Sequence, residues 1–148
     1  MDYIREAVEY LKNYSNLITS ISNLKDEIYE LRVDLKCTKE LNYSDMPTAL
    51  GDVSITDDAV VNKMFRLKKA EEEYKETTRT LKRMDKVFET FENSNLYYSK
   101  ILKGYFIEQY TEDQLAKDLD CSDRHLRRLK QKALRVFAIQ IFGINAMK

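Results

Sequence analysis

The chain has 148 residues with only three glycines and one proline, and its 25 lysines and arginines balance 25 aspartates and glutamates. Turn-rich β proteins need far more glycine and proline, so the composition excludes them and predicts an all-α protein of one or two domains. One histidine and two distant cysteines predict no metal site and two reduced thiols. No apolar run reaches the ~18 residues of a membrane span, and the first residues lack the apolar segment of a signal peptide. We therefore expect a cytoplasmic protein without membrane contact.

A heptad pattern of apolar residues occupies the first part of the chain. It predicts one continuous helix from about residue 2 to residue 36, with a coiled-coil seam along one side. The seam consists of Tyr3, Ala7, Tyr10, Tyr14, Leu17, Ile21, Leu24, Ile28, Leu31 and Leu35. Residues 38–56 show no such period and contain Pro47 and Gly51, which predicts a long loop.

A second long helix is predicted from a cap at Thr56 to about Glu92. Its stripe is Val60, Met64, Leu67, Ala70, Tyr74, Thr77, Leu81, Met84, Phe88 and Phe91. The two long helices match in length and are joined by a loop, so residues 1–92 are predicted to form an antiparallel helical hairpin, a coiled coil. The alternative is that each helix pairs with its mate in a homodimer.

Residues 93–148 are predicted to form a smaller helical domain. Its first helix covers about 96–108. Thr111, with Gln114 at the capping-box spacing, then begins a short helix, and Ser122 caps a further helix that Gly143 ends. Two helices in such quick succession, with a tight connection at Asp120 and Cys121, have the layout of a helix-turn-helix.

The outer face of the second of these helices is basic. The stretch from Asp123 to Arg135 holds six arginines and lysines against one aspartate, a net charge of +5. Charge on this helix favours entry into a DNA major groove over the alternative, a solvated surface. The candidate DNA-binding residues are Ser122, Arg124, His125, Arg127, Arg128, Lys130, Gln131, Lys132 and Arg135. Of these, Arg124, Arg128 and Gln131 are expected at base edges, and Ser122, His125, Arg127, Lys130 and Lys132 near phosphates.

The stretch T-E-D-Q-L-A-K-D-L-D-C-S-D-R-H-L-R-R-L-K-Q-K-A-L, residues 111–134, resembles region 4 of bacterial sigma factors. The matching positions are Thr111, Leu115, Ala116, Leu119, Ser122, Arg124, Leu126, Lys132, Ala133 and Leu134. The sequence departs from that pattern at Asp120, where sigma factors usually have glycine, and at Gln114, where they usually have glutamate. Because glycine relieves a tight turn, its absence at residue 120 is expected to affect the geometry of the turn.

The whole chain is similar to a narrower group, the ArpU- and RinA-like activators of late genes in phages and prophages of Gram-positive bacteria. The similarity lies in a tyrosine-rich opening, a loop with Y-S-D-M-P at residues 43–47, a second charged helix and the sigma-like tail. It implies a transcription regulator that binds double-stranded DNA and contacts host RNA polymerase. The helical hairpin is the element expected to form a homodimer, to contact polymerase, or both.

Two other functions remain open. A DNA-packaging accessory similar to a small terminase subunit also joins a helix-turn-helix to coiled-coil helices. A polymerase-binding protein could use the sigma-like tail without touching DNA. An enzyme is not expected, because the chain has a single histidine, no glycine-rich phosphate loop and no cysteine–histidine cluster. We therefore predict no catalytic residue, no cofactor and no metal.

Overall fold

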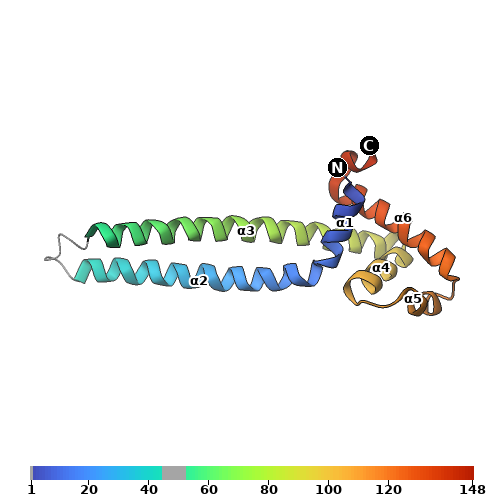
Figure 1. Ribbon diagram of the computed structural model, residues 1–148, viewed down its shortest axis with the longest axis horizontal. Helices are drawn as coiled ribbons and strands as arrows, with labels where there is room; N and C mark the ends of the chain where they lie inside the picture. The colour runs from blue at the N-terminus through green and yellow to red at the C-terminus, as the bar shows by residue number, and fades with distance from the viewer. Residues whose placement is uncertain (1, 45–52) are drawn as a thin grey trace. The chain divides into compact units, whose positions relative to one another are not determined.

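The computed structural model describes residues 2–44 and 53–148, and within these ranges side chains are described for 2–37 and 58–148. The elements are α1 (Tyr3–Lys12), α2 (Tyr14–Ser44), α3 (Val53–Ser94), α4 (Leu96–Leu102), a π-helical turn η1 (Lys103–Ile107), α5 (Glu112–Asp118), α6 (Asp123–Phe142) and a 3₁₀ turn η2 (Gly143–Met147) (Figure 1). Every regular element in the described ranges is helical, which confirms the predicted all-α class. None of these helices is long and apolar enough to cross a membrane.

The chain divides into two compact units. One is the two-helix unit, residues 19–79, and the other, here called the terminal unit, combines residues 1–18 with residues 80–148. The predicted single boundary between residues 92 and 93 falls within the terminal unit. The difference arises because α1 and the end of α3 pack with α6 in the terminal unit, where Ala7, Leu11, Phe88 and Phe137 are all buried.

The predicted continuous helix from residue 2 to residue 36 is wrong at Asn13, where α1 ends and α2 begins one residue later. The Asn13 side chain donates a hydrogen bond to the carbonyl of Glu9 at 2.9 Å, the local competition by which asparagine disfavours a helix interior. Before this break, on α1, the rings of Tyr3 and Tyr10 both contact Phe142 of α6, with centroids 5.3 and 5.6 Å apart. These two tyrosines, predicted for the hairpin seam, therefore pack on the last turn of α6.

The predicted loop of residues 38–56 is too long. The α2 helix continues to Ser44 and α3 begins at Val53, so Thr56 lies inside α3 and does not cap it. The strongest helix breakers of this stretch, Pro47 and Gly51, both fall within residues 45–52, outside the described part of the chain. Loss of the heptad period marks the loss of a packing seam, and it does not by itself end a helix.

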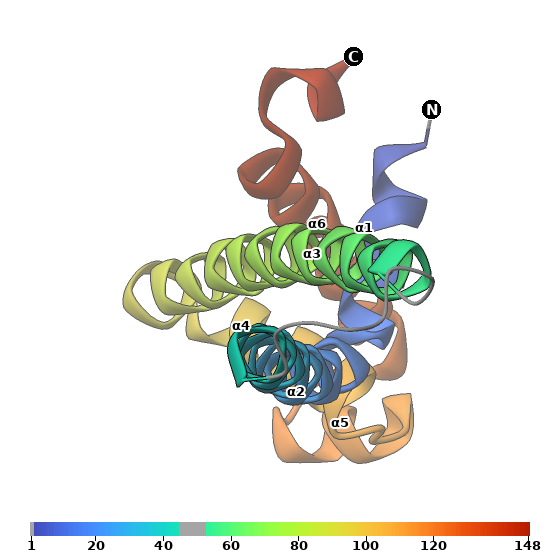
Figure 2. The ribbon, with the colours of Figure 1, turned by 90° about the vertical axis from the view of Figure 1, so that its left-hand side faces the viewer.

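In the two-helix unit α2 and α3 run antiparallel, side by side in both views (Figures 1 and 2). The apolar contacts come from the predicted heptad positions: Leu24, Ile28 and Ala70 are buried, and Leu67 and Tyr74 pack against them. The pair is stabilised by burial of these side chains and not by backbone hydrogen bonds between the helices, since each helix satisfies its own backbone.

One part of the core of the terminal unit lies between α4, α5 and α6. Ile101, Leu115, Ala116 and Leu126 form a buried cluster there. The helix predicted for residues 96–108 changes to a π-helical turn at Lys103. Gly104 lies in this turn, where an added Cβ would come within 2.6 Å of a methyl carbon of Leu115. Absence of a side chain at Gly104 thus lets the turn approach α5 closely.

Tyr14, at the start of α2, links this helix to the end of α3 in the terminal unit. Its hydroxyl donates to Oδ1 of Asp85 at 2.5 Å, and its ring meets the Phe88 ring edge-on. Burial and the Asp85 carboxylate raise the pKa of Tyr14 from 10.0 to about 12. Because the pKa in the folded state is the higher one, the stability that this contact contributes is present below pH 10.0 and is lost as the pH rises through about 12.

We expect Tyr14→Phe to remove one late-titrating phenol from a spectrophotometric titration and to reduce the loss of stability in this alkaline window. The exposed Tyr97 provides the control variant, Tyr97→Phe. Equal numbers of phenolic protons released at the alkaline end by wild type and Tyr14→Phe would contradict the assignment.

Candidate nucleic-acid interface

The N-terminus of α5 has the predicted capping box. The backbone N–H of Gln114 donates to Oγ1 of Thr111 at 3.2 Å, and the backbone N–H of Thr111 donates to Oε1 of Gln114 at 3.1 Å. Glutamine therefore performs here the capping role that glutamate has in the sigma-factor pattern. The cap defines where α5 starts, and with it the position of the connection to α6.

The connection from α5 to α6 consists of four residues, 119–122. The backbone N–H of Cys121 donates to the carbonyl of Ala116 at 3.0 Å, which closes the turn. Ser122 then caps α6 as predicted, because its Oγ accepts a hydrogen bond from the backbone N–H of His125 at 3.2 Å. Asp120 has φ of 53°, in the left-handed region that favours glycine.

The left-handed conformation explains the glycine usual at this place in the sigma-factor pattern. We expect Asp120→Gly to raise the free energy of unfolding by about 0.5–1 kcal/mol, because glycine adopts a positive φ without the steric cost. Asp118→Gly, a matched change within α5, should not raise it, because glycine has a lower helix propensity than aspartate. Urea unfolding followed by circular dichroism measures both. Destabilisation by Asp120→Gly would show that the Asp120 side chain stabilises the turn.

The α6 helix separates the predicted inner and outer residues. Leu126, Ala133 and Leu134 are buried, and Leu129 is half-buried. Eight of the nine candidate residues are exposed: Ser122, Arg124, His125, Arg127, Arg128, Gln131, Lys132 and Arg135. Lys130 is the half-buried exception. A single helix thus presents most of the candidate residues to solvent.

Two of the candidate cations contact the protein itself. Glu112, in the first turn of α5, accepts from Nζ of Lys130 at 2.7 Å and from Nε of Arg127 at 2.9 Å. Nζ of Lys130 also lies 4.0 Å from the centroid of the Tyr105 ring. We call Glu112, Arg127 and Lys130 the Glu112 clamp, because it ties α6 to α5. Only 16% of the Lys130 side chain is exposed, against 65% for Arg127.

The two cations of the Glu112 clamp favour the charged form of the Glu112 carboxyl. Hydrogen bonds from Lys130 and then Arg127 lower the pKa of this carboxyl below 4.5. Its contribution to stability is therefore present above pH 4.5 and is lost as the pH falls through the lowered pKa. We expect Glu112→Gln to lower the free energy of unfolding by about 1 kcal/mol at neutral pH, a modest value because the group is partly exposed to solvent.

Urea unfolding at neutral and at acidic pH tests the clamp. The difference between wild type and Glu112→Gln should vanish in acid, whereas Glu89→Gln, a change at an exposed position of α3, should be near neutral at both. A difference that stays the same at both pH values would mean that the carboxylate charge does not stabilise the α5–α6 contact.

The other cations of α6 form an open row. Arg124, Arg128, Lys132 and Arg135 take part in no ion pair among the side chains that the structure describes. A hollow of about 520 Å³ adjoins this row; it is lined by Ile4, Arg128, Gln131, Lys132, Leu134 and Arg135. We call Arg124, Arg128, Lys132 and Arg135 the basic row. Unpaired guanidinium and ammonium groups of this kind are suited to bind phosphate oxygens and the acceptor edges of bases.

Acidic side chains lie at the start of α6. A hydrogen bond to Asp113 and the repulsion between the two carboxyl groups raise the pKa of Asp123. Negative charge suits this position because the N-terminus of a helix carries partial positive charge. The basic row begins at Arg124 and extends along α6 toward Arg135, away from these carboxyl groups.

Two features of this surface were not predicted from the sequence. Ile4 of α1 borders the hollow beside the basic row, although it precedes α6 by more than a hundred residues. The Glu112 clamp also joins two helices, and no periodic pattern in the sequence predicts it.

Comparison of the chain with models of known protein families, with curated proteins and with solved structures finds no match. The function must therefore be argued from the geometry of α5 and α6.

Proposed function

We propose that this protein is a DNA-binding transcription regulator in which α5, the four-residue turn and α6 act as a helix-turn-helix. The observation that carries the proposal is the basic row, four cations on the exposed side of the second helix of a capped pair that form no ion pair among the described side chains. A merely solvated helix would more often pair such cations with carboxylates three or four residues away. Within α6 those spacings offer none to any cation of the row.

In the proposed complex α6 enters the major groove and α5 crosses the backbone above it. Arg124 and Arg128 can donate two hydrogen bonds each to the O6 and N7 atoms of guanine, and Gln131 can pair with the N6 and N7 atoms of adenine. The remaining exposed candidates contact phosphates: Ser122, His125, Arg127, Lys132 and Arg135. Lys130 holds the two helices together through Glu112, so its role is to position α6.

The biological setting follows from the resemblance of residues 111–134 to sigma region 4 and of the whole chain to late-gene activators. We propose a phage or prophage regulator that acts on late genes. Its antiparallel long helices then form a hairpin available for contact with protein, either another copy of the chain or host RNA polymerase. The sigma-like part alone would not require helices as long as α2 and α3.

Binding-site selection with the purified full-length protein tests DNA recognition, followed by fluorescence anisotropy on the selected duplex over a range of salt concentrations. With three cations on phosphates, Arg127, Lys132 and Arg135, the logarithm of the binding constant should fall with the logarithm of salt with a slope of about −3. Failure to select any sequence, together with binding that does not depend on salt, would remove the proposal.

The two alternative functions give different results in the same preparation. A packaging accessory should form a ring of many subunits, visible as a large mass by mass photometry. A polymerase-binding protein that does not touch DNA should retain polymerase in a pull-down and shift no duplex. A monomer or dimer that selects a sequence supports regulation.

A further inference from the structure

The hollow beside the basic row is formed by two helices that lie far apart in the sequence. Ile4 of α1 borders it on one side, and residues of α6 between 128 and 135 supply the rest of its lining. The contacts of Tyr3 and Tyr10 with Phe142 hold α1 against α6. The start of α1 is therefore a fixed wall beside the exposed face of α6.

The lining of this hollow combines apolar carbon with positive charge. Ile4 is 43% exposed at its edge, and Leu134 is buried beneath it. The six lining residues include no aspartate or glutamate, and three of them are cations of the basic row: Arg128, Lys132 and Arg135. A molecule that fills the hollow must therefore carry negative charge next to an apolar part.

The acidic residue at the start of α1 is already used by the helix itself. Oδ1 of Asp2 accepts hydrogen bonds from the backbone N–H groups of Ile4 at 3.1 Å and of Arg5 at 3.2 Å. This carboxylate therefore caps α1 and is not among the groups that line the hollow.

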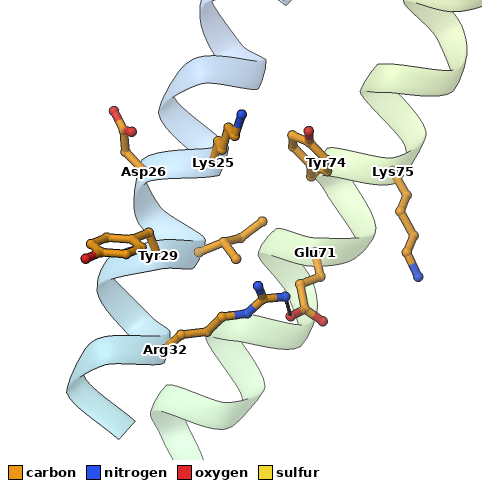
Figure 3. A pocket seen from close by; sticks show the side chains of 8 residues that line it. Lys25, Asp26, Tyr29, Arg32, Glu71, Tyr74 and Lys75 are labelled. Carbon is orange, nitrogen blue, oxygen red and sulfur yellow. Dashed lines mark hydrogen bonds and ion pairs between the residues drawn. The ribbon is translucent and has the colours of Figure 1, made fainter. Parts of the chain in front are cut away.

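A larger groove, of about 680 Å³, lies between α2 and α3 in the two-helix unit, but it is less suited to an anion. Its lining carries charges of both signs, and Arg32 there already pairs with Glu71 at 2.9 Å (Figure 3). The three cations beside Ile4, by contrast, take part in no ion pair among the side chains that the structure describes. Free positive charge thus distinguishes the smaller hollow.

The positive charge also continues beyond the hollow. From Arg124 to Arg135 the basic row extends roughly 16 Å along α6, at about 1.5 Å per residue. A single small anion would leave most of this row without a partner, whereas duplex DNA carries one negative charge per ~1.7 Å of its axis. Deoxyribose places apolar carbon beside each of these phosphates. The DNA backbone therefore matches both the charge of the row and the apolar edge at Ile4.

We propose that the hollow holds one sugar–phosphate unit of the DNA backbone, and that Ile4 packs against its deoxyribose. Lys132 and Arg135 donate to the phosphate of this unit, while Arg128 and Gln131 extend past the sugar to the base edges. The role of Ile4 rests on the proposed function and extends it, because α1 lies outside the helix-turn-helix. Contacts of this kind fix the register of the protein on DNA and carry no sequence information.

Fluorescence anisotropy of Ile4→Ala on the selected duplex tests the apolar contact. Binding should weaken roughly 4-fold, the equivalent of one CH₂ group lost from a buried contact. The factor should be the same on single-base variants of the duplex, and the salt dependence should be unchanged, because isoleucine carries no charge. Ile18→Ala is the matched control: Ile18 is 49% exposed in the same unit, lies outside the hollow and should leave binding unchanged.

Charged side chains at residue 4 should act in opposite directions. Ile4→Lys adds one cation beside the phosphate, so it should strengthen binding and steepen the salt slope by about 1. Ile4→Glu places a carboxylate against the phosphate and should weaken binding at least ~10-fold. Glutamate suits the first turn of a helix, so the helical circular dichroism should be unchanged. The same two changes at Ile18 are the controls.

Replacing the phosphates of the duplex one at a time by uncharged methylphosphonate locates the contact. At one position the gain expected of Ile4→Lys should disappear, because the phosphate beside the hollow has lost its charge. Should Ile4→Glu lose helicity, Ile4→Lys decides alone.

Equal affinity of wild type and every Ile4 variant for the selected duplex would overturn the role of Ile4 and leave the proposed function in place. A loss by Ile4→Ala that is confined to one base pair would also overturn it, because Ile4 would then contact a base and not a sugar. A wild type that selects no sequence and binds without salt dependence would remove the proposed function, and the role of Ile4 with it.

Discussion

Phe137→Ala is expected to lower the free energy of unfolding by about 3–5 kcal/mol, the usual cost of removing a buried aromatic ring from a core. Phe137 is fully buried, and its ring centroid lies 5.8 Å from that of Phe88. This contact joins α6 to α3, and Ala138, the next residue along, is buried as well. The loss would be a large share of the ~5–15 kcal/mol by which natural domains are stable.

Urea unfolding followed by circular dichroism measures this change, with Tyr97→Ala as the matched control. Tyr97 belongs to the same unit and is 55% exposed, so its truncation should cost no more than about 1 kcal/mol. If Phe137→Ala and Tyr97→Ala unfolded at the same urea concentration, the packing of α6 against α3 would be wrong.

Arg128→Ala is expected to weaken binding to the selected DNA site by roughly 10- to 150-fold, the equivalent of about 1–3 kcal/mol. Arg128 is exposed, lies within the basic row and forms no ion pair among the described side chains. Its guanidinium is therefore free to donate to a guanine. The variant should also discriminate less well between bases at the one base pair that Arg128 contacts.

Fluorescence anisotropy with the selected duplex and with single-base variants of it measures both effects. Arg79→Ala, at an exposed arginine of α3 in the two-helix unit, is the matched control and should leave affinity unchanged. Arg127→Ala should instead weaken binding about equally on all sequences and reduce the salt dependence, since it is expected near a phosphate. Unchanged affinity of Arg128→Ala would remove this residue from the interface.

The Glu112 clamp connects the stability of the terminal unit to the orientation of α6. Because Glu112 holds both Arg127 and Lys130, it fixes the rotation of α6 relative to α5 and so directs the basic row outward. It also withdraws Lys130 from the surface. A residue chosen for its charge in the sequence therefore has a positioning role in the structure.

The sequence by itself determined the features that depend on neighbouring residues. The capping box at Thr111, the cap at Ser122 and the end of α6 at Gly143, which has φ of 72°, all rely on side chains and backbone within a few residues. The helical class and the outward face of α6 follow from composition and a 3.6-residue period. These local signals sufficed to list the candidate DNA-binding residues.

Only the tertiary structure decided the rest. The π-helical turn at Gly104, the clamp at Glu112 and the position of Ile4 beside the basic row each depend on contacts between different helices. Likewise, the division at residues 18 and 80 reflects which apolar faces meet. A heptad pattern shows that a helix has an apolar face, but it does not name the partner, because burial rewards any apolar surface of suitable shape.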